Sequence, residues 1–317
     1  MSQHSDVLVV GGGAAGLAAA VTLGRALRSV TVIDAGQPRN APADGVHGFL
    51  TRDGLAPTEL VALGQEEARR YGARIVSGRA VSARREGDGF AVDLADGTTY
   101  TARRLVVATG VRDELPAVEG LVGRWGRDVV HCPYCHGYEH RGEPIGVLGT
   151  GPVALHQVML FAQLSDDVAY FRHTAPEPSD DEREQLAARG IEIVEGPVAA
   201  VVVEADRLAG VRMTDGRVVP RSALVVAPRV VAESPVLDAL GAARVPHPMG
   251  AQLGEFYPAD PVTGAAAVPG VWLAGNVRDL QAQVVTAASQ GTVAAAWLNA
   301  DLAAADTALA VAARRGR

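Results

Sequence analysis

A short apolar run followed at once by a glycine turn is the feature that most constrains the fold of this chain. Asp6-Val7-Leu8-Val9-Val10 is typical of a buried parallel strand, and Gly11-Gly12-Gly13-Ala14-Ala15-Gly16 leads into an alanine-rich stretch that reaches Arg28. Turns of this kind join a strand to a helix in dinucleotide-binding units. The chain is therefore expected to open with a three-layer α/β domain.

The glycines of this turn have separate expected roles. Gly11 would permit the tight turn, Gly13 the close approach of the backbone to a pyrophosphate, and Gly16 the packing of helix on strand. Residues 30–33 predict a second strand that ends in Asp34, whose carboxylate can accept both ribose hydroxyls of an adenosine. Glycine turns also cap ordinary helices, but strand, turn, helix, second strand and terminal acid all follow in register here.

A second glycine turn lies near the middle of the chain. Residues 144–148 predict a strand that leads into Gly149-Thr150-Gly151-Pro152-Val153-Ala154, where Ala154 replaces the third glycine without disturbing helix packing. The next strand, 168–171, ends in Arg172-His173 instead of an acid. One arginine can bind a 2′-phosphate. Acidic residues that would repel this phosphate follow Arg172 closely, namely Glu177, Asp180, Asp181, Glu182 and Glu184. Gly149, Gly151, Ala154 and Arg172 are the candidate NAD(P)H residues of a unit that is not clearly built for that cofactor.

Composition narrows the class of protein. With 317 residues, 48% of them hydrophobic, the chain is long enough for two cores, and its net charge of −7 argues against nucleic acid as a partner. The absence of lysine excludes Walker-type phosphate loops and Schiff-base chemistry. We find no secretion signal and no apolar stretch long enough for a membrane, so a cytoplasmic enzyme is expected.

The order of the predicted elements suggests one domain inserted into another. Hairpin signals at Asp96-Gly97 and Asp215-Gly216 each precede a buried strand, at 105–110 and 223–228, so the two halves repeat one plan. The expected fold is α/β, with two Rossmann-like three-layer nucleotide-binding domains. Residues 1–122 and 247–317 would form a discontinuous first domain, and residues 123–246 the second. A last strand at 271–276 precedes a helix expected at about 282–302.

The only two cysteines of the chain lie between the glycine turns, in His131-Cys132-Pro133-Tyr134-Cys135-His136-Gly137. In a reducing compartment such a pair indicates redox catalysis or metal binding. The metal alternative would use the cysteines with His136 and His140, but adjacent Cys135 and His136 make a tetrahedral site awkward. Redox catalysis requires that the motif begin a helix, whose dipole lowers a thiol pKa.

Taken together, these motifs resemble the low-molecular-weight thioredoxin reductase family over nearly the whole chain. The resemblance rests on the two glycine turns, Ala108-Thr109-Gly110, the Cys-x-x-Cys-x-Gly segment, and Ala274-Gly275-Asn276 followed by Gln283 and Thr286-Ala287-Ala288. Cys-Pro-Tyr-Cys-His-Gly-Tyr-Glu is most similar to the branch that contains the dithiol oxidases of gliotoxin and holomycin biosynthesis.

This resemblance implies FAD as cofactor and a homodimer built through the FAD domains. It implies that Cys135 faces the flavin and that Cys132 exchanges with the substrate thiol. The FAD contacts that carry over are Gly11, Gly13, Gly16, Asp34, Arg39, Asn40, His47, Ala80, Gly110, Asn276 and Gln283.

Three departures from the family pattern bear on function. His136 stands where reductases place an aspartate that acts as general acid and base, and an imidazole can do that work near neutral pH; the alternative is a histidine merely packed beside the flavin. Asn276 replaces the aspartate of a Gly-Asp motif, although an amide can still hydrogen-bond the ribityl chain. The consecutive arginines that grip NADPH in the reductases are missing, which counts against NADPH.

The sequence therefore predicts a FAD-dependent thiol–disulfide oxidoreductase that oxidises a small dithiol through Cys132 and Cys135, with oxygen as final acceptor. The first alternative is an NADPH-dependent reductase of thioredoxin or another disulfide, in which a thioredoxin-like protein would be the partner. The second alternative is a non-catalytic redox or metal sensor.

Overall fold

The computed structural model of the chain describes residues 4–151 and 153–316. Contacts divide the chain into two compact units. Unit 1 comprises Met1–Arg39, Pro57–Arg112 and Val230–Arg317, and unit 2 comprises Asn40–Ala56 and Asp113–Arg229. The domain boundaries expected after residues 122 and 246 stay predictions.

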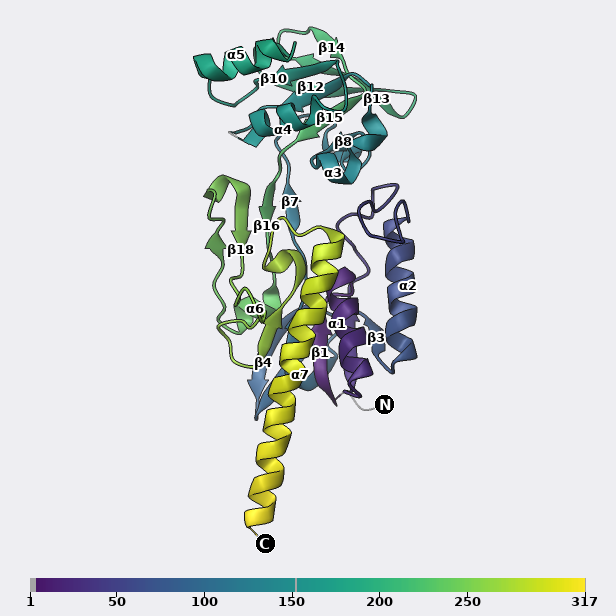
Figure 1. The fold of residues 1–317 in the computed structure, drawn as a ribbon, viewed down its shortest axis with the longest axis vertical. Helices are drawn as coiled ribbons and strands as arrows, with labels where there is room; N and C mark the ends of the chain where they lie inside the picture. The colour runs from purple at the N-terminus through teal and green to yellow at the C-terminus, as the bar shows by residue number, and fades with distance from the viewer. Residues whose placement is uncertain (1–3, 152, 317) are drawn as a thin grey trace. The chain divides into compact units, whose positions relative to one another are not determined.

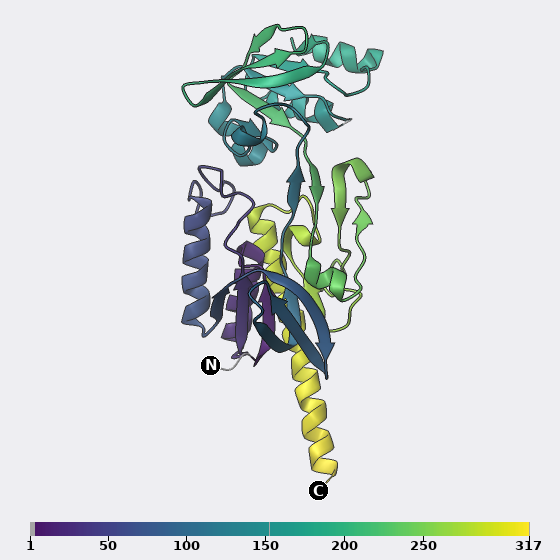
Figure 2. The same cartoon turned by 180° about the vertical axis from the view of Figure 1, so that it is seen from behind.

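Unit 1 is built on a seven-stranded sheet with the order β3-β2-β1-β6-β5-β4, in which β19 also pairs with β6. Strands β3, β2, β1, β6 and β19 run parallel, whereas β4, β5 and β6 are antiparallel neighbours. Figure 2 shows the antiparallel part in blue, from the side opposite to that of Figure 1. The strands are β1 (His4–Val10), β2 (Val30–Asp34), β3 (Arg74–Ser77), β4 (Ala80–Glu86), β5 (Gly89–Leu94), β6 (Thr99–Val107) and β19 (Val271–Leu273). The hairpin predicted at Asp96-Gly97 is confirmed, with Gly97 at a φ of 85°.

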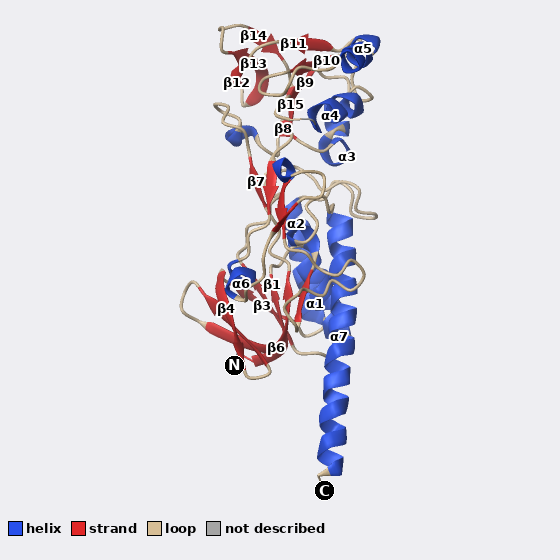
Figure 3. Cartoon of the chain, turned by 90° about the vertical axis from the view of Figure 1, so that its left-hand side faces the viewer, coloured by secondary structure: helices blue, strands red, loops and turns tan. Residues whose placement is uncertain are grey.

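Successive side chains of β1 point to opposite faces of the sheet, and both faces are buried because the run Val7–Val10 is apolar throughout. Val7 and Val9 pack in one core with helices α1 (Ala14–Arg25) and α7 (Val284–Arg315), and Leu8 and Val10 pack in another with α6 (Pro235–Ala239). Figure 1 and Figure 3 show α1 and α7 side by side, on one side of the strands. A fourth helix of the unit, α2 (Pro57–Arg70), lies beside α1.

Close contact between α1 and α7 depends on one glycine. A Cβ atom added to Gly291 would lie 2.0 Å from the backbone oxygen of Ala15, which no real side chain tolerates. Small residues therefore let the two helices approach along the face that covers the sheet.

The end of α7 corrects the sequence-based expectation. The helix was expected to end near Leu302, but it continues to Arg315. The segment 303–315 is rich in alanine and contains neither glycine nor proline, so its own helix propensity is high. Arg314 and Arg315 in the last turn also suit the negative end of the helix dipole.

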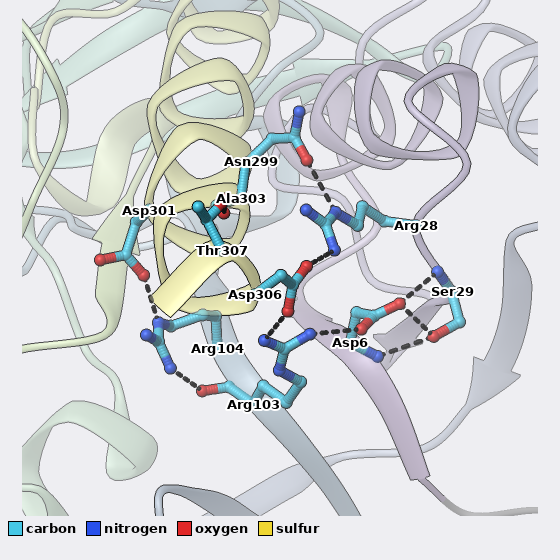
Figure 4. A network of polar contacts seen from close by, with 10 residues as sticks. All are labelled: Asp6, Arg28, Ser29, Arg103, Arg104, Asn299, Asp301, Ala303, Asp306 and Thr307. Atoms are coloured by element: carbon cyan, nitrogen blue, oxygen red, sulfur yellow. Dashed lines mark hydrogen bonds and ion pairs between the residues drawn. The ribbon is translucent and has the colours of Figure 1, made fainter. Parts of the chain in front are cut away.

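A network of ion pairs fixes the second half of α7 to the sheet (Figure 4). Asp306 accepts from Arg28, with NH1 and Oδ2 2.7 Å apart, and also from Arg103. Arg103 reaches on to Asp6 at 3.1 Å, and Arg104 binds Asp301 at 2.5 Å. Single exposed pairs contribute little to stability, but a network that shares its partners holds each side chain in one geometry.

Unit 2 repeats the three-layer plan on a smaller scale. Its parallel sheet has the order β11-β10-β9-β15-β8, and an antiparallel sheet of β12, β13 and β14 packs on one face while α4 and α5 cover the other. The elements are β8 (Val129–Val130), α3 (Pro133–His136), β9 (Ile145–Leu148), α4 (Val153–Phe161), β10 (Val168–Phe171), α5 (Asp180–Ala188), β11 (Glu192–Val194), β12 (Val198–Glu204), β13 (Arg207–Met213), β14 (Val218–Pro220) and β15 (Ala223–Val226). Short 3-10 turns are η1 (Val122–Arg124) and η2 (Tyr138–His140).

The chain crosses between the units within two strands of a fourth sheet, which has the order β17-β18-β16-β7. Its strands are β7 (Arg112–Glu114), β16 (Arg229–Val231), β17 (Val245–Pro246) and β18 (Gly254–Phe256). The remaining 3-10 turns are η3 (Ala251–Leu253) and η4 (Gly275–Val277). Within the ranges that the structure describes, no helix combines the length and apolar character that a bilayer crossing requires.

The first prediction concerns the contact between α1 and α7. Gly291→Ala gains about 1 kcal/mol of helix propensity, but it places a methyl group against the backbone of Ala15. We expect a net loss of roughly 2 kcal/mol in the free energy of unfolding, measured by urea titration, because overpacking costs more than propensity returns. The matched control is Thr292→Ala at the next, exposed position of the same helix. A variant as stable as the parent would contradict the tight packing.

The second prediction concerns the ion-pair network. Hydrogen bonds from Arg28 and Arg103 hold the pKa of Asp306 below its ordinary value of 3.8. A lowered pKa in the folded state means that this contribution is present above pH 4 and is lost as the pH falls through the folded value. Asp306→Asn should therefore remove amide protection from the second half of α7 already at pH 7, measured by hydrogen exchange. Thr307→Ala is the control, and equal protection in both variants would refute the role of the network.

Candidate functional site

Aligned strand ends bring the predicted cofactor residues of unit 1 to one edge of the sheet. Val10 lies opposite Ile33 of β2 and Val107 of β6, and Val107 lies opposite Leu273 of β19. The residues that follow these four strands therefore share one edge, which is where open α/β sheets bind ligands. This edge carries Gly11, Gly13, Asp34, Gly110 and Asn276.

The first glycine turn has the conformation that its sequence predicts. Gly11 has a φ of 106°, and an added Cβ would lie 2.3 Å from the backbone oxygen of Ala108. At Gly16 an added Cβ would meet the oxygen of Gly11 at 1.9 Å. By contrast, no described atom lies within 4 Å of an added Cβ at Gly13 or Gly110. Neighbouring backbone therefore leaves no room for a side chain at Gly11 and Gly16, whereas Gly13 and Gly110 face the space where a pyrophosphate would lie.

The N-terminus of α1 is also suited to a phosphate. Gly13 is its N-cap and supplies no capping side chain, and the first turn contains no acidic residue. The backbone N–H groups of this turn are therefore left for an anion. Asp34 accepts a hydrogen bond from the Gly12 N–H at 3.0 Å, which fixes its carboxylate beside the turn. These donors and acceptors fit the adenosine and pyrophosphate of FAD.

The remaining cofactor residues of unit 1 occupy different local settings. The side-chain NH2 of Asn276 donates to the carbonyls of Asp279, Leu280 and Ala282, at 3.1, 3.3 and 2.9 Å, so its oxygen is the atom that suits a ribityl hydroxyl. Gln283 is the N-cap of α7, and Ala80 begins β4. Their contacts with FAD stay predictions, as do those of Arg39 and Asn40, which flank the point where the chain passes between units.

In unit 2 the dithiol and the second glycine turn share one edge of the parallel sheet. Val130 lies opposite Val225, and Val226 lies opposite Leu148, so β8 and β9 end at the same side. Gln157 of α4 donates to the backbone oxygen of His131 at 2.8 Å and ties the dithiol segment to the helix behind that turn. Pro152, within the turn, lies outside the described residues.

Cys132 and Cys135 lie on the short helix that the redox hypothesis requires. Cys132 is the N-cap of α3 and Pro133 follows at the first helical position. The two Sγ atoms are 2.6 Å apart. The N–H groups of Cys135 and His136 both point to the Cys132 carbonyl, at 3.3 and 3.2 Å, so the three residues form one turn.

His136 is the most unusual side chain of the site. Both ring nitrogens are buried, and neither has a hydrogen-bond partner among the residues that the structure describes. Burial lowers the pKa of this imidazole, and Glu139 acts in the opposite direction. A buried, unpartnered polar group is unfavourable for folding, so the protein holds this imidazole beside the dithiol at a cost in stability; the catalytic role of His136 stays a prediction.

The structure also shows carboxylates that the sequence interpretation missed, which face two of the histidines it named. His47, expected to touch FAD, has its Nδ1 3.3 Å from Asp53 and its Nε2 3.4 Å from Glu139. His140 pairs with Glu143 at 2.9 Å, and no group of three or more potential metal ligands was found in residues 4–151 and 153–316. Glu139 is the last residue of the Cys-Pro-Tyr-Cys-His-Gly-Tyr-Glu segment, and this place in the motif is the sequence signal that could have identified it.

The second glycine turn ends beside a neutralised arginine. The Nε of Arg172 lies 2.5 Å from Glu195, and its NH1 also reaches the Ala175 carbonyl at 3.4 Å. The neighbouring His173 accepts the Val198 N–H at 3.0 Å through Nδ1, and burial lowers its pKa. Gly151 has open space around an added Cβ, whereas at Gly149 that atom would meet Tyr170 and the Arg172 backbone.

Comparison with known proteins places these features in a family. Residues 5–291 match the family described as pyridine nucleotide-disulphide oxidoreductase. A thioredoxin reductase, sirT of Leptosphaeria maculans, is 33% identical over 96% of both chains, and tcpT of Claviceps purpurea, also a thioredoxin reductase, is 32% identical over 92% of both.

Solved structures agree with these relatives. The crystal structure of HlmI is 46% identical, covers 98% of this chain and 97% of its own, and superposes with a TM-score of 0.90. A putative thioredoxin reductase from Bacillus anthracis, 26% identical over 95% and 99% of the two chains, has a TM-score of 0.88. The predicted fold class and family are confirmed. This chain belongs to the pyridine nucleotide-disulphide oxidoreductase family and is a thioredoxin reductase-like oxidoreductase.

Proposed function

We propose that this enzyme uses FAD to oxidise a small-molecule dithiol to a disulfide through Cys132 and Cys135. The observation that carries the redox role is the pair of sulfurs 2.6 Å apart beside the buried, unpartnered imidazole of His136. The resemblance of the cysteine segment to the dithiol oxidase branch supports the oxidative direction.

The charges beside the second glycine turn also favour oxidation. Reductases of the family grip NADPH with consecutive arginines, whereas Arg172 is ion-paired with Glu195 and His173 uses its Nδ1 as an acceptor. A 2′-phosphate would have to displace Glu195 before it could bind this guanidinium. Gly149, Gly151 and Ala154 would then keep the form of a nucleotide-binding turn without selecting NADPH.

The proposed exchange proceeds in two sulfur-transfer steps. One substrate thiolate attacks Cys132 of the oxidised pair, which forms a mixed disulfide and releases Cys135 as a thiolate. The second substrate thiolate attacks the substrate sulfur of that bond, which closes the substrate disulfide and releases Cys132. His136 takes up a proton from a substrate thiol during exchange. When bound, FAD would supply the acceptor for the two electrons of the reduced Cys132–Cys135 pair, whose disulfide would then reform, and oxygen would be the final acceptor and give hydrogen peroxide.

Most of the residues that would hold the cofactor belong to unit 1. Gly11, Gly13 and Gly16 would shape the pyrophosphate turn and Asp34 would bind the ribose, and the other proposed contacts in this unit are Arg39, Ala80, Gly110, Asn276 and Gln283. Two further proposed contacts, Asn40 and His47, belong to unit 2. A homodimer through the FAD domains and a cytoplasmic location belong to the same proposal. Exposed apolar residues on α7 support the dimer: Val285, Val293 and Trp297.

A second candidate function is NADPH-dependent reduction of thioredoxin or another disulfide. The family description and the names of sirT and tcpT favour it. The two functions share every residue of the dithiol site and differ in where the electrons enter.

The third prediction separates these functions. Under anaerobic conditions, dithiothreitol should bleach the flavin absorbance of the FAD-loaded protein, whereas NADPH at micromolar concentration should not, because Arg172, the arginine beside the second glycine turn, is ion-paired with Glu195. In air, each dithiol oxidised should consume one oxygen molecule. Cys135→Ser should keep FAD but abolish bleaching by the dithiol. Bleaching by NADPH alone would establish the reductase instead.

The fourth prediction tests the neutralised arginine. Glu195→Gln should release Arg172 and tighten NADPH binding two- to fivefold relative to NADH, roughly the strength of one partly exposed ion pair. Glu192→Gln, at the first residue of β11, the strand that Glu195 directly follows, makes the same charge change without touching Arg172 and is the control. An unchanged preference in Glu195→Gln would show that Arg172 does not face the 2′-phosphate.

A further inference from the structure

One short stretch of α7 contacts two parts of unit 1 that carry predicted FAD residues. At Gly291 the helix lies so close to α1 that an added Cβ would meet the backbone oxygen of Ala15 at 2.0 Å. The preceding residue, Gln290, reaches the Asn276 loop (residues 274–283), which joins β19 to α7. Two adjacent residues of α7 therefore contact both the first turn of α1 and the loop that carries Asn276.

Gln290 uses both ends of its side-chain amide on the Asn276 loop. Its Oε1 accepts the Gly275 N–H at 2.9 Å, and its Nε2 donates to Oδ2 of Asp279 at 2.9 Å. Oδ1 of the same carboxylate accepts the Gln281 N–H at 3.2 Å. Gln290 and Asp279 are both partly buried, and a hydrogen bond to a carboxylate is stronger than one between neutral groups. Gln290 therefore ties two points of the loop to the helix.

The Asn276 loop folds around the side chain for which it is named. The NH2 group of Asn276 donates to the carbonyls of Asp279, Leu280 and Ala282, at 3.1, 3.3 and 2.9 Å. Because an amide nitrogen carries two donors and an amide oxygen carries none, the opposite orientation would set an oxygen against three other oxygens. The loop therefore fixes which end of this amide faces the backbone, and it leaves Oδ1 as the end for a ligand.

Asp279 joins these two sets of hydrogen bonds. Its backbone oxygen accepts from Asn276 and from the Ala282 N–H, the latter at 3.1 Å, while its side chain accepts from Gln290. Gly275, the other residue that Gln290 holds, directly precedes Asn276 and has a φ of 75°, a left-handed conformation that favours glycine. Gln290 therefore holds the backbone on both sides of Asn276.

We propose that Gln290 is a positioning residue for FAD, which fixes the Asn276 loop so that Oδ1 of Asn276 can accept a ribityl hydroxyl. Gln290 acts through the loop and not by contact with the cofactor. A loop that is already ordered costs less binding free energy than one that must be ordered when the ligand binds. This role rests on FAD as cofactor and on the Asn276 contact, which belong to the proposed function, and not on the direction of electron flow.

The first test exchanges the partners of the bond between Gln290 and Asp279. Gln290→Glu keeps an acceptor for Gly275 but sets a carboxylate against that of Asp279, so the dissociation constant of FAD should rise about tenfold or more. Adding Asp279→Asn supplies a side-chain NH2 that can donate to the new carboxylate, and it restores the net charge of the parent. The double variant should therefore bind FAD within about threefold of the parent.

The FAD dissociation constant is measured by flavin fluorescence on serial dilution of the FAD-loaded protein. If Gln290→Glu alone fails to fold or to retain FAD, the double variant still decides the question. Recovery of FAD binding in the double variant would support the role of the Gln290–Asp279 bond, and continued failure would refute it.

A second pair of variants tests the orientation of Asn276. Asn276→Asp sets a carboxylate oxygen against three carbonyls and should weaken FAD binding about tenfold or more. The matched control is Asn299→Asp on α7, which adds the same charge. Oδ1 of Asn299 accepts from Arg28 at 2.8 Å, and a carboxylate keeps that bond, so FAD binding should stay unchanged.

Hydrogen exchange measures the position of the loop independently of catalysis. In Gln290→Glu the amides of residues 275–282 should exchange faster than in the parent, in the FAD-loaded protein and after removal of FAD, while those of α2 stay unchanged. The double variant should return the loop to the exchange rates of the parent.

Two results would overturn the inference: an FAD dissociation constant that Gln290→Glu leaves unchanged, or one that stays raised in the double variant. A parent protein that binds no FAD would refute the cofactor itself. Flavin reduction by NADPH would refute only the proposed direction of electron flow, and it would leave the binding and exchange measurements intact. The failure of the inference and the failure of the proposed function are therefore distinguishable.

Discussion

The register of the parallel strands is the constraint on which the rest of the structure depends. Because Val10 is aligned with Ile33 and Val107, the ends of three strands coincide, and residues that are distant in sequence meet at one edge. In unit 2 the alignment of Val226 with Leu148 has the same effect for the second glycine turn. A slip of one residue would invert every side chain along a strand and dismantle both cores.

The two units use this common geometry with opposite electrostatics. At the end of β2, Asp34 lies beside a turn whose backbone is open at Gly13. At the end of β10, Arg172 is already bound to Glu195. A repeated fold therefore does not imply a repeated ligand, because the few side chains at the strand ends decide what the edge can bind.

Local signals in the sequence predicted most of the fold. The glycine turns, the hairpins at Asp96-Gly97 and Asp215-Gly216, and the strands leading into each turn are all encoded by neighbouring residues, and the structure confirms them. The sequence interpretation ended α7 near Leu302, although no residue there marks the end of a helix. It also missed the ion pairs that hold the last turns, because the partners of Asp306 are far away in sequence. The pairs Arg172–Glu195 and His47–Glu139 were missed for the same reason: each needs the tertiary fold to bring two loops together.

One detail of α3 links sulfur chemistry to backbone position. The N–H groups of Cys135 and His136 share a single acceptor, the Cys132 carbonyl. A disulfide restricts the geometry of both cysteines more tightly than two thiols do. A shift of the Cys132 backbone would therefore move the one acceptor that the Cys135 and His136 N–H groups share, so the positions of both cysteines and of the imidazole are coupled through a single carbonyl.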